Sequence, residues 1–495
     1  MGAMPGILFA HGVASGDPTP QAVVIWTRVT TGAEGVAVTW QVASDEALTD
    51  VVASGETRAQ VQHDHCVHVD VEGLSPATTY FYGFESGGER SPVGRTKTLA
   101  TNPDRVRFAQ VSCAKFNAGW LNAYARIADR VDELDFLLHL GDYIYEASQT
   151  PPPSQTPSPD IGRPFEPMGE CRTLAEYRTR YAQYHRDPQV QAVHQAMPMI
   201  ATLDDHELAD GAWRDGAEEH REAEHGPWSV RKAAAFQARW EWLPTRPPDP
   251  SDTTRVFRDV SFGDLADLYL LDIRSRRDQP ALDPVMSEPG RTMLGAEQRD
   301  WLLGALDTST AAWRLVGSPS IMHRTWVDNA GEPLTTALLK LKLMDEDAEG
   351  PDEDQWDGYP VERTRLFERF AALEDVVVLS SDIHVCVASE LRLDDGTPVS
   401  VEITTPSLTS QNLDDKLKVE PRADVIAESE RAFCAALDHV LWCDFSGHGY
   451  AVVDVDAERV RAEWWLVNSL REGDDGEYRA AGVEVARGTR RLASV

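Results

Sequence analysis

The stretch Phe-Leu-Leu-His-Leu-Gly-Asp-Tyr-Ile-Tyr-Glu at residues 136–146 decides the fold, because an apolar run passes at a glycine directly into polar residues. A short apolar run of this kind is typical of a strand that is buried on both faces of a parallel sheet. In open α/β sheets, functional side chains lie beyond the carboxyl ends of the strands. Asp142 and Tyr145 are therefore candidate site residues at the end of a buried strand.

Three further apolar runs, at residues 106–111, 199–203 and 376–379, end in the same manner. Amphipathic segments such as residues 122–134 separate the runs, and this alternation predicts an α/β domain. Because strand ends meet at one edge of a sheet, the polar residues after these runs are expected to converge with those after the first. They are Ser112-Cys113, Asp204-Asp205-His206-Glu207 and Ser381-Asp382-Ile383-His384.

The N-terminal part of the chain has a different pattern. Between residues 7 and 100, short strand-like runs are separated by turn residues, which predicts a β-sandwich. The Leu-x-Pro-x-Thr-x-Tyr-x-Tyr stretch at residues 74–82 resembles the tyrosine corner of fibronectin type III domains, where a tyrosine hydroxyl bonds to nearby backbone. We expect a fibronectin-III-like sandwich at residues 1–102 and a larger α/β domain at residues 103–495. A structural role for the sandwich is favoured over a docking role.

The composition restricts the partners of this protein. It has 495 residues, 42% of them apolar, and a net charge of −34. Such a charge repels nucleic-acid phosphates, and no apolar run approaches the roughly 20 residues that span a bilayer. Nucleic-acid binding and stable membrane insertion are therefore not expected. An anionic substrate would need local cations, such as bound metals or arginines. The acidic run at residues 345–354 is interpreted as a solvated loop rather than a calcium site.

The six cysteines include no Cys-x-x-Cys pair, so they indicate neither a disulfide scaffold nor a zinc site. Cys434 and Cys443 would bridge in an oxidising compartment, a point that the sequence leaves open. The N-terminus has no basic segment followed by an apolar stretch, and a secretory signal is therefore not expected in this chain.

The order of the strand-end motifs resembles the calcineurin-like metallophosphoesterase superfamily. In that pattern, Gly-Asp supplies a metal-bridging carboxylate, Gly-Asn-His-Glu the catalytic histidine, and Gly-His-x-His the last ligands. Here Ser112-Cys113 replaces the usual first Asp-x-His motif. Gly317-Ser318-Pro319 stands where a later histidine is expected, and His323 is a poor substitute. Both departures match one branch, the PhoD-like alkaline phosphatases, which also include phospholipase D-type phosphodiesterases.

This resemblance covers nearly the whole chain. It implies a four-layer α/β/β/α metallophosphoesterase domain at residues 103–495, preceded by the small β-sandwich domain. The stretches that carry it are residues 9–18, 112–113, 141–146, 204–207, 272–274, 356–359 and 381–384.

The resemblance also implies two metal positions. Thiolate and phenolate are anionic donors that stabilise a trivalent transition metal. Carboxylates suit a hard cation, with Mn²⁺ or Zn²⁺ as alternatives to Ca²⁺ at the second position. By resemblance, a ferric ion, Fe³⁺, would be held by Cys113, Asp142, Tyr145 and His384, and Ca²⁺ would lie near Asp142, Asp205 and Asp382.

The implied activity is that of an alkaline phosphatase D-type hydrolase, which would hydrolyse phosphomonoesters by a metal-activated hydroxide at an Fe³⁺–Ca²⁺ type centre. His206 would protonate the leaving oxygen, with Asp205 beside it in the same motif. Glu207 or Asp204 would either orient His206 or cap a helix. Candidates for contact with the phosphate are Arg178, Arg274 and Arg277.

Two alternatives remain open. A phosphodiesterase or phospholipase D-type hydrolase would use the same metals, and the loops at residues 147–171 and 325–360 would decide between the two ester classes. A β-sandwich surface-binding protein with a decayed catalytic domain is disfavoured, because every ligand position is filled. The resembled family is usually exported, so we expect a secreted or cell-envelope location for a mature form and a cytoplasmic one otherwise. The sequence leaves the substrate and the oligomeric state open.

Overall fold

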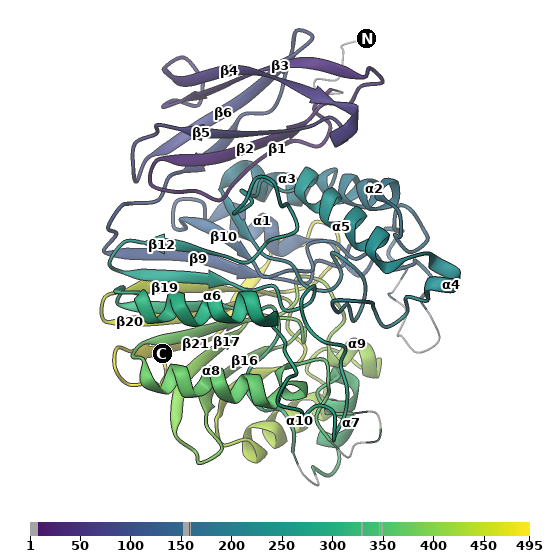
Figure 1. Cartoon of the computed structure of the whole chain (residues 1–495), viewed down its shortest axis with the longest axis vertical. Coiled ribbons are helices and arrows are strands. Elements are labelled where there is room, and N and C mark those ends of the chain that lie inside the picture. Colours follow the sequence, from purple (N-terminus) through teal and green to yellow (C-terminus); the bar gives the residue numbers. More distant parts are fainter. Residues whose placement is uncertain (1–7, 152–157, 159, 328–329, 346, 348–349) are drawn as a thin grey trace.

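The computed structural model describes residues 8–151, 158, 160–327, 330–345, 347 and 350–495. Its N-terminal part is the expected β-sandwich, drawn in purple at the top of Figure 1. One layer has the order β4-β3-β6-β7 with β8 on β6, and the other contains β1, β2 and β5. The amide of Ser75 donates to the hydroxyl oxygen of Tyr80 over 2.9 Å, which is the expected tyrosine-corner bond. The strands are β1 (Val13–Gly16), β2 (Ala22–Arg28), β3 (Gly35–Ala43), β4 (Val51–Gln60), β5 (Cys66–Glu72), β6 (Thr79–Ser86), β7 (Glu89–Arg90) and β8 (Gly94–Lys97).

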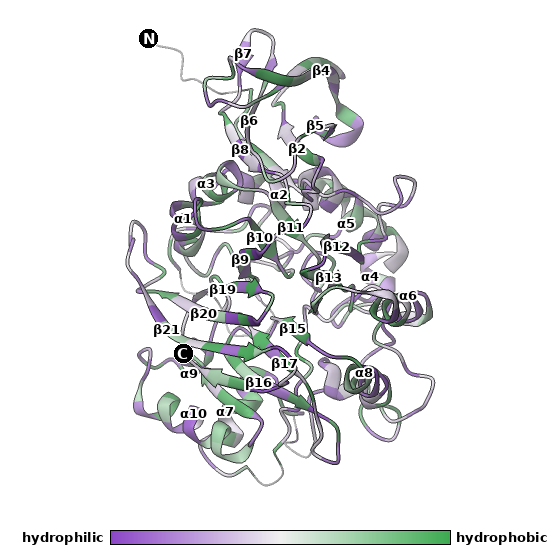
Figure 2. Cartoon of the chain, turned by 90° about the vertical axis from the view of Figure 1, so that its left-hand side faces the viewer, coloured by the Kyte–Doolittle hydropathy of each residue, from purple (hydrophilic) through white to green (hydrophobic). Residues whose placement is uncertain are grey.

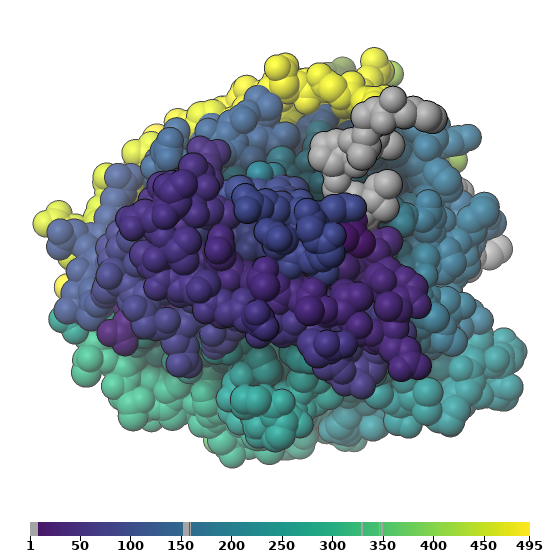
Figure 3. Space-filling model, turned by 90° about the horizontal axis from the view of Figure 1, so that it is seen from above, coloured from purple at the N-terminus to yellow at the C-terminus, as the bar shows by residue number. Residues whose placement is uncertain are grey.

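One layer of the sandwich continues the first sheet of the α/β domain. Strand β1 pairs in parallel with β11 (Met199–Ala201), and Gly16 lies opposite Met199 in the register. Trp26 on β2 also donates its indole N–H to the carbonyl of Glu241 over 2.8 Å. Figure 3, viewed from above, shows the purple residues of the sandwich lying across blue and teal residues of the α/β domain. Backbone pairing as well as side-chain contacts therefore hold the sandwich in place.

Two sheets form the middle of the α/β domain. The first extends from β11 in the order β22-β21-β20-β19-β9-β10-β11, and the second has the order β12-β13-β14-β15-β17-β16-β18. Strands β9, β10 and β11 are parallel, as are β13, β14, β15 and β17. Their bounds are β9 (Arg105–Val111), β10 (Phe136–His139), β12 (Arg258–Phe262), β13 (Ala266–Leu270), β14 (Trp313–Gly317), β15 (Val376–Ser380), β16 (Cys386–Arg392), β17 (Pro398–Thr404), β18 (Val440–Asp444), β19 (Gly449–Asp456), β20 (Arg459–Val467), β21 (Glu477–Ala486) and β22 (Leu492–Ser494).

The α/β domain has the expected four layers, α/β/β/α. A hydrophobic core that includes Phe108, Leu138 and Val377 lies between the two sheets. Helices α1, α2, α3 and α5 pack on the outer face of the first sheet, and α6 and α8 pack on that of the second. In Figure 2 the hydrophobic colour is concentrated on strands such as β15 and β16, whereas helix α1 mixes both colours. The helices are α1 (Asn122–Asp129), α2 (Leu174–His185), α3 (Pro188–Ala196), α4 (Glu222–His225), α5 (Trp228–Trp242), α6 (Gly295–Thr308), α7 (Leu334–Leu341), α8 (Pro360–Ala372), α9 (Leu413–Leu417) and α10 (Asp424–Ala436), with 3₁₀ turns η1 (Val61–His63) and η2 (Trp356–Gly358).

Local sequence explains where these elements begin and end. The four apolar runs form β9, β10, β11 and β15, and each is followed by the polar motif that the sequence places there. Helix α2 begins at a capping box in which Thr173 and Glu176 satisfy each other's backbone amides. Within the described residues, no helix combines the length and hydropathy that crossing a membrane requires, and the longest, α5, has 15 residues.

Candidate metal centre

Four loops at the carboxyl ends of parallel strands converge on one point of the α/β domain. These loops follow β9, β10, β11 and β15. Three groups of side chains each place their ligand atoms within 4.8 Å of one another, and Asp142 belongs to every group. The groups are Cys113-Asp142-His384, Asp142-Asp205-His206 and Asp142-Asp204-Asp205-Asp382.

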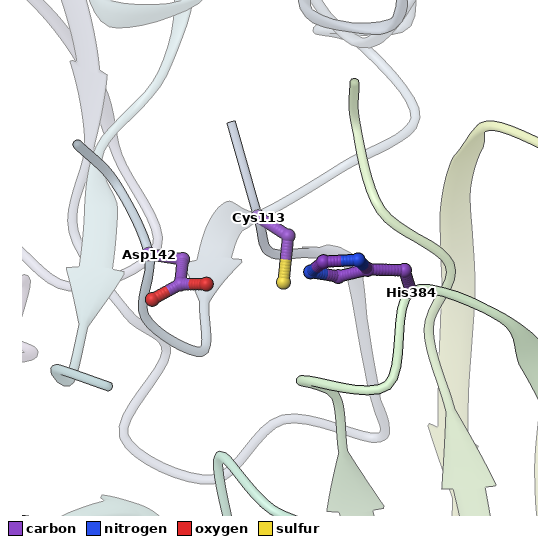
Figure 4. Close-up of side chains that lie close together, drawn as sticks. All are labelled: Cys113, Asp142 and His384. Atoms are coloured by element: carbon purple, nitrogen blue, oxygen red, sulfur yellow. The ribbon is translucent and has the colours of Figure 1, made fainter. Parts of the chain in front are cut away.

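The first group is built around Cys113. Figure 4 shows its thiol between the carboxylate of Asp142 and the ring of His384. The hydroxyl of Tyr145 donates to Oδ2 of Asp142 over 2.8 Å and lies 3.3 Å from Nε2 of His384, so the phenol joins this group. Nδ1 of His384 lies 3.1 Å from the carbonyl of Gln411, which can only accept a proton. The other nitrogen, Nε2, therefore offers its lone pair to the group.

The protonation of this group depends on a cation. Burial raises the pKa of the Cys113 thiol and of the Tyr145 phenol, and the carboxylate of Asp142 raises both pKa values further. Both side chains would keep their protons in such surroundings, whereas a metal ion at the group would stabilise the thiolate and the phenolate. The donors of this group, three of them anionic when deprotonated, fit a trivalent transition metal.

The third group, Asp142-Asp204-Asp205-Asp382, consists of carboxylates alone. Oδ2 of Asp204 and Oδ1 of Asp205 are buried, and neither has a hydrogen-bond partner among the described residues. Burial and the neighbouring carboxylates raise the pKa of Asp142 and of Asp204 well above the usual value. Buried, unpaired carboxylate oxygens are unfavourable unless a cation lies against them. This oxygen-rich set, which Asp382 completes, fits a hard cation of the calcium type.

The loops that carry these ligands have unusual backbone conformations. Left-handed φ angles in non-glycine residues cost about 1–3 kcal/mol each and cluster at functional sites. Gly141, with φ 106°, allows close packing, because a Cβ there would lie 2.4 Å from the amide nitrogen of Asp204. The ligand residues with left-handed φ are Cys113 (60°), Asp142 (56°), Asp382 (75°) and His384 (66°).

Glu207 ties the loops after β10 and β11 together. Its buried carboxylate accepts from the amides of Asp142 at 3.0 Å, Tyr143 at 2.5 Å and Asp204 at 2.8 Å. Because both of its oxygens are occupied by backbone amides, Glu207 does not orient His206. Its contribution is to fix the relative position of two loops that carry candidate ligands.

His206 is oriented by a different carboxylate. Its Nδ1 lies 2.7 Å from Oε2 of Glu146, and its ring packs on the ring of Tyr145 with the centroids 4.0 Å apart. Burial alone would lower the pKa of His206, but the carboxylates of Glu146, Asp205 and Asp142 outweigh it and raise the pKa well above its usual value. Glu146 belongs to the same strand-end motif as Asp142 and Tyr145, so the sequence contained this partner without revealing its role.

Two of the arginines expected to contact phosphate lie beside the cluster, but their guanidinium groups already form ion pairs with carboxylates. Arg274 is fully buried and pairs with Asp204, Asp354 and Asp382. Arg277 is equally buried and donates to Oδ1 of Asp354 over 2.5 Å. These guanidinium groups hold the carboxylates in place and present no free face in this arrangement.

The third of these arginines is not brought to the cluster. Arg178 on α2 donates to both carboxylate oxygens of Glu241 and to the carbonyl of Gln62 in the sandwich. Arg178 therefore links the sandwich to helices α2 and α5.

Asp354 and Gln355 are site residues that the sequence did not reveal. The interpretation of the acidic run as a solvated loop is wrong at Asp354, which binds Arg274 and Arg277; Glu346 and Glu349 of that run lie outside the described residues. The side-chain amide of Gln355 donates to Asp382. The available signal was the pair Arg274 and Arg277, which follow the apolar run at residues 268–271. Arginines that become buried require carboxylate partners, so acidic residues elsewhere in the chain had to pair with them.

Other residues singled out in the sequence lie away from the three groups. His323 is buried with its Nδ1 2.7 Å from Glu402, so it does not supply the histidine missing after Gly317. The sulfur atoms of Cys434 and Cys443 lie 3.6 Å apart, and both cysteines are free thiols.

Comparisons with known proteins agree with this geometry. A family model described as PhoD-like phosphatase matches residues 108–464, and one for the N-terminal domain of that family matches residues 5–100. The chain is 36% identical over 410 residues to alkaline phosphatase D of Bacillus subtilis (strain 168), a match that covers 78% of this chain and 66%, just under two thirds, of that protein. A solved structure of PhoD superimposes with a TM-score of 0.86 at 30% identity, covering 100% of this chain and 93% of that one.

Proposed function

Since this chain belongs to the PhoD-like phosphatase family, we propose that it is a metal-dependent hydrolase of phosphate esters, with phosphomonoesters as its substrates. The observation that carries the proposal is the buried cluster around Asp142. There, four strand-end loops bring together a thiol, a phenol, imidazoles and carboxylates. Within each group the ligand atoms lie within 4.8 Å of one another, close enough to bind one cation together.

The residues present fit two metal positions. Cys113, Asp142, Tyr145 and His384 would hold Fe³⁺, and Asp142, Asp204, Asp205 and Asp382 would hold Ca²⁺. The unpaired buried oxygens of Asp204 and Asp205 support the second position, since they lack any other partner among the described residues. When bound, such ions supply Lewis-acid activation of the phosphoryl group and of water.

The chain's own side chains would supply the proton. The 2.7 Å contact with Glu146 fixes Nδ1 of His206, so Nε2 is the nitrogen available to the leaving oxygen. Glu146 is itself held, because its Oε1 accepts from the amide of Asp210 over 2.8 Å. We assign His206 as the general acid and Glu146 as its positioning residue, with Asp205 at the second metal position rather than in proton transfer.

The test is an assay of the purified chain with p-nitrophenyl phosphate, after loading with iron and calcium and after chelation. We expect hydrolysis only in the loaded protein. Asp142→Asn, which changes the one residue shared by all three groups, should abolish hydrolysis and lower the content of both metals. Exposed Asp395, outside the cluster, provides the control variant Asp395→Asn. Hydrolysis that persists undiminished in Asp142→Asn would refute the proposal.

A further inference from the structure

Two of the six cysteines lie side by side and belong to none of the three groups of candidate metal ligands. Cys434 belongs to the last turn of helix α10, and Cys443 belongs to strand β18. Their sulfur atoms lie 3.6 Å apart, although the residues are nine positions apart in the sequence. All six cysteines lie in the described part of the chain, and these two form the one pair whose sulfur atoms are in hydrogen-bonding contact.

The surrounding core holds the two thiols in place. Phe433, the residue before Cys434, packs edge-on against Phe445 with the ring centroids 5.3 Å apart. A carboxylate oxygen of Glu430, one turn earlier on α10, accepts from the amide of Phe445 over 2.8 Å. These contacts fix the end of α10 against the end of β18. The two sulfur atoms therefore meet because the fold brings their backbones together.

The step from this contact to a covalent bond is short. A disulfide has a sulfur–sulfur distance of about 2.0 Å, so the two atoms have to approach by roughly 1.5 Å. Rotation of the two side chains about their Cα–Cβ bonds supplies a movement of this size. Helix α10 and strand β18 can therefore stay where they are when the bond forms.

The two thiols differ in the properties that decide which of them reacts first. Cys443 is 6% exposed, whereas Cys434 is only partly buried. The pKa of Cys434 is lowered, because the thiol of Cys443 donates a hydrogen bond to it, and burial and the carboxylate of Glu430 do not cancel this effect. The same hydrogen bond, together with burial, raises the pKa of Cys443. Since the thiolate is the attacking species, Cys434 is the thiol that reacts with a reagent from solvent.

We propose that Cys434 and Cys443 form a thiol–disulfide site that a low-molecular-weight disulfide of the glutathione type oxidises, with Cys434 attacking and Cys443 completing the bond. The thiolate of Cys434 attacks one sulfur of the external disulfide, forms a mixed disulfide with it and releases one thiolate. The thiolate of Cys443 then attacks the sulfur of Cys434 and releases the second thiolate. The chain loses two protons and two electrons, and the reagent takes them up as it becomes two thiols. Neither cysteine takes part in the proposed hydrolysis.

The bridge acts next to a segment that orients a candidate metal ligand. The carbonyl of Phe445, two residues after Cys443, accepts from the amide of Leu413 over 3.0 Å. The loop that precedes Leu413 contains Gln411, whose carbonyl lies 3.1 Å from Nδ1 of His384. Oxidation therefore restrains the strand end to which this loop is bonded, and local opening of the loop should become rarer.

The first experiment incubates the full chain with oxidised or with reduced glutathione, denatures it and blocks the remaining thiols with iodoacetamide. Both cysteines lie in one tryptic peptide, residues 432–459, because Arg431 and Arg459 flank it and no lysine or arginine lies between them. We expect this peptide to lose two hydrogen atoms on oxidation and to accept no blocking group. Treatment with a reducing agent should restore both thiols. A bridge to any other cysteine would instead join this peptide to a second one.

Single variants test the order of attack. Cys443→Ser should accumulate a glutathione adduct on Cys434, because the second step is missing. Cys434→Ser should carry at least about tenfold less adduct, because its remaining thiol is buried and has a raised pKa. Cys66→Ser is the matched control, since Cys66 is 6% exposed like Cys443 but contacts no other cysteine sulfur among the described residues. This control should form the bridge as the wild-type chain does.

The bridge should also stabilise the folded chain. Closing a loop of nine positions restricts the unfolded state and is expected to raise Tm by about 2–3 °C in a chain of this length. The increase should be absent in Cys434→Ser and present in Cys66→Ser. Hydrogen exchange at the amide of Leu413 should be slower in the oxidised wild-type chain than in the reduced one.

Three results would overturn the inference: two free thiols in the peptide at an excess of oxidised glutathione, a bridge to another cysteine, or an adduct on Cys443 in place of Cys434. If a serine variant melts early, the corresponding alanine variant replaces it. The mass measurement on the wild-type chain needs no substitution and decides in either case. None of these measurements depends on hydrolysis of an ester, so failure of the proposed function would leave their outcome unchanged.

Discussion

Nδ1 of His206 lies 2.7 Å from Oε2 of Glu146, so a histidine at the end of β11 is held by a carboxylate from the loop after β10. This relationship joins two of the four loops that build the cluster. It also determines which nitrogen of His206 remains for the substrate, because a carboxylate on Nδ1 holds the ring with its proton there.

His206→Ala is therefore expected to lower kcat by roughly 10²–10⁴, the usual contribution of a general acid, without changing the metal content. Steady-state kinetics and elemental measurement on the same preparation check this. Glu146→Gln, which keeps the shape of the side chain, should lower kcat by less and flatten the pH profile. Loss of metal from His206→Ala would identify this residue as a ligand and refute its role as a general acid.

Tyr145 is expected to bind iron as a phenolate and to give the loaded protein a visible charge-transfer band. Tyr145→Phe should remove the band because the phenyl ring has no donor oxygen. Tyr143→Phe is the control, since the hydroxyl of Tyr143 contacts His185 and His194 instead of the cluster. Absorption spectra of the two variants at equal iron content check the prediction, and a band retained in Tyr145→Phe would contradict it.

Metal removal is expected to lower stability, because Oδ2 of Asp204 and Oδ1 of Asp205 lose the partner that offsets their burial. At a thousandfold excess of metal over its Kd, the linkage contributes about 4 kcal/mol. Thermal unfolding with and without chelator measures the effect, and Asp205→Asn should shrink the difference between the two curves. Identical curves for the wild-type chain would show that these oxygens hold no metal.

Glu207→Gln is expected to destabilise the protein by about 1–3 kcal/mol, because an amide nitrogen would replace one of the oxygens that accept three backbone amides. Metal retention should fall as well, since the loops after β10 and β11 lose their common anchor. Chemical denaturation and metal content measure both effects, with the exposed Glu458→Gln as control. Unchanged stability in Glu207→Gln would show that the backbone holds these loops without it.

The sequence predicted the strand ends because a buried parallel strand has a plain signature, an apolar run that stops at a polar motif. That signature was enough to predict that the polar residues after the strand ends lie close together, namely Cys113, Asp142, Asp205, Asp382 and His384. It could not assign partners to charged side chains, because the pairing of Arg274 with Asp354 or of His206 with Glu146 depends on how loops cross in space.

The pairing of β1 with β11 could not be predicted from the sequence either. Gly16 and Met199 carry no pattern that marks them as neighbours, since backbone hydrogen bonds leave little trace in side-chain type. A sandwich and an α/β domain were expected in series along the chain. The structure shows instead that they share a sheet.

That shared sheet has a consequence for biosynthesis. The segment that forms β1 leaves the ribosome long before the segment that forms β11, and its outer edge stays unpaired during that interval. Long-range strand pairing of this kind forms slowly, and an unpaired edge invites association with other chains. Nascent chains of this protein are therefore expected to expose the edge of β1 until β11 has been synthesised. A chain cut at residue 102 would expose the edge of β1 on one product and the edge of β11 on the other.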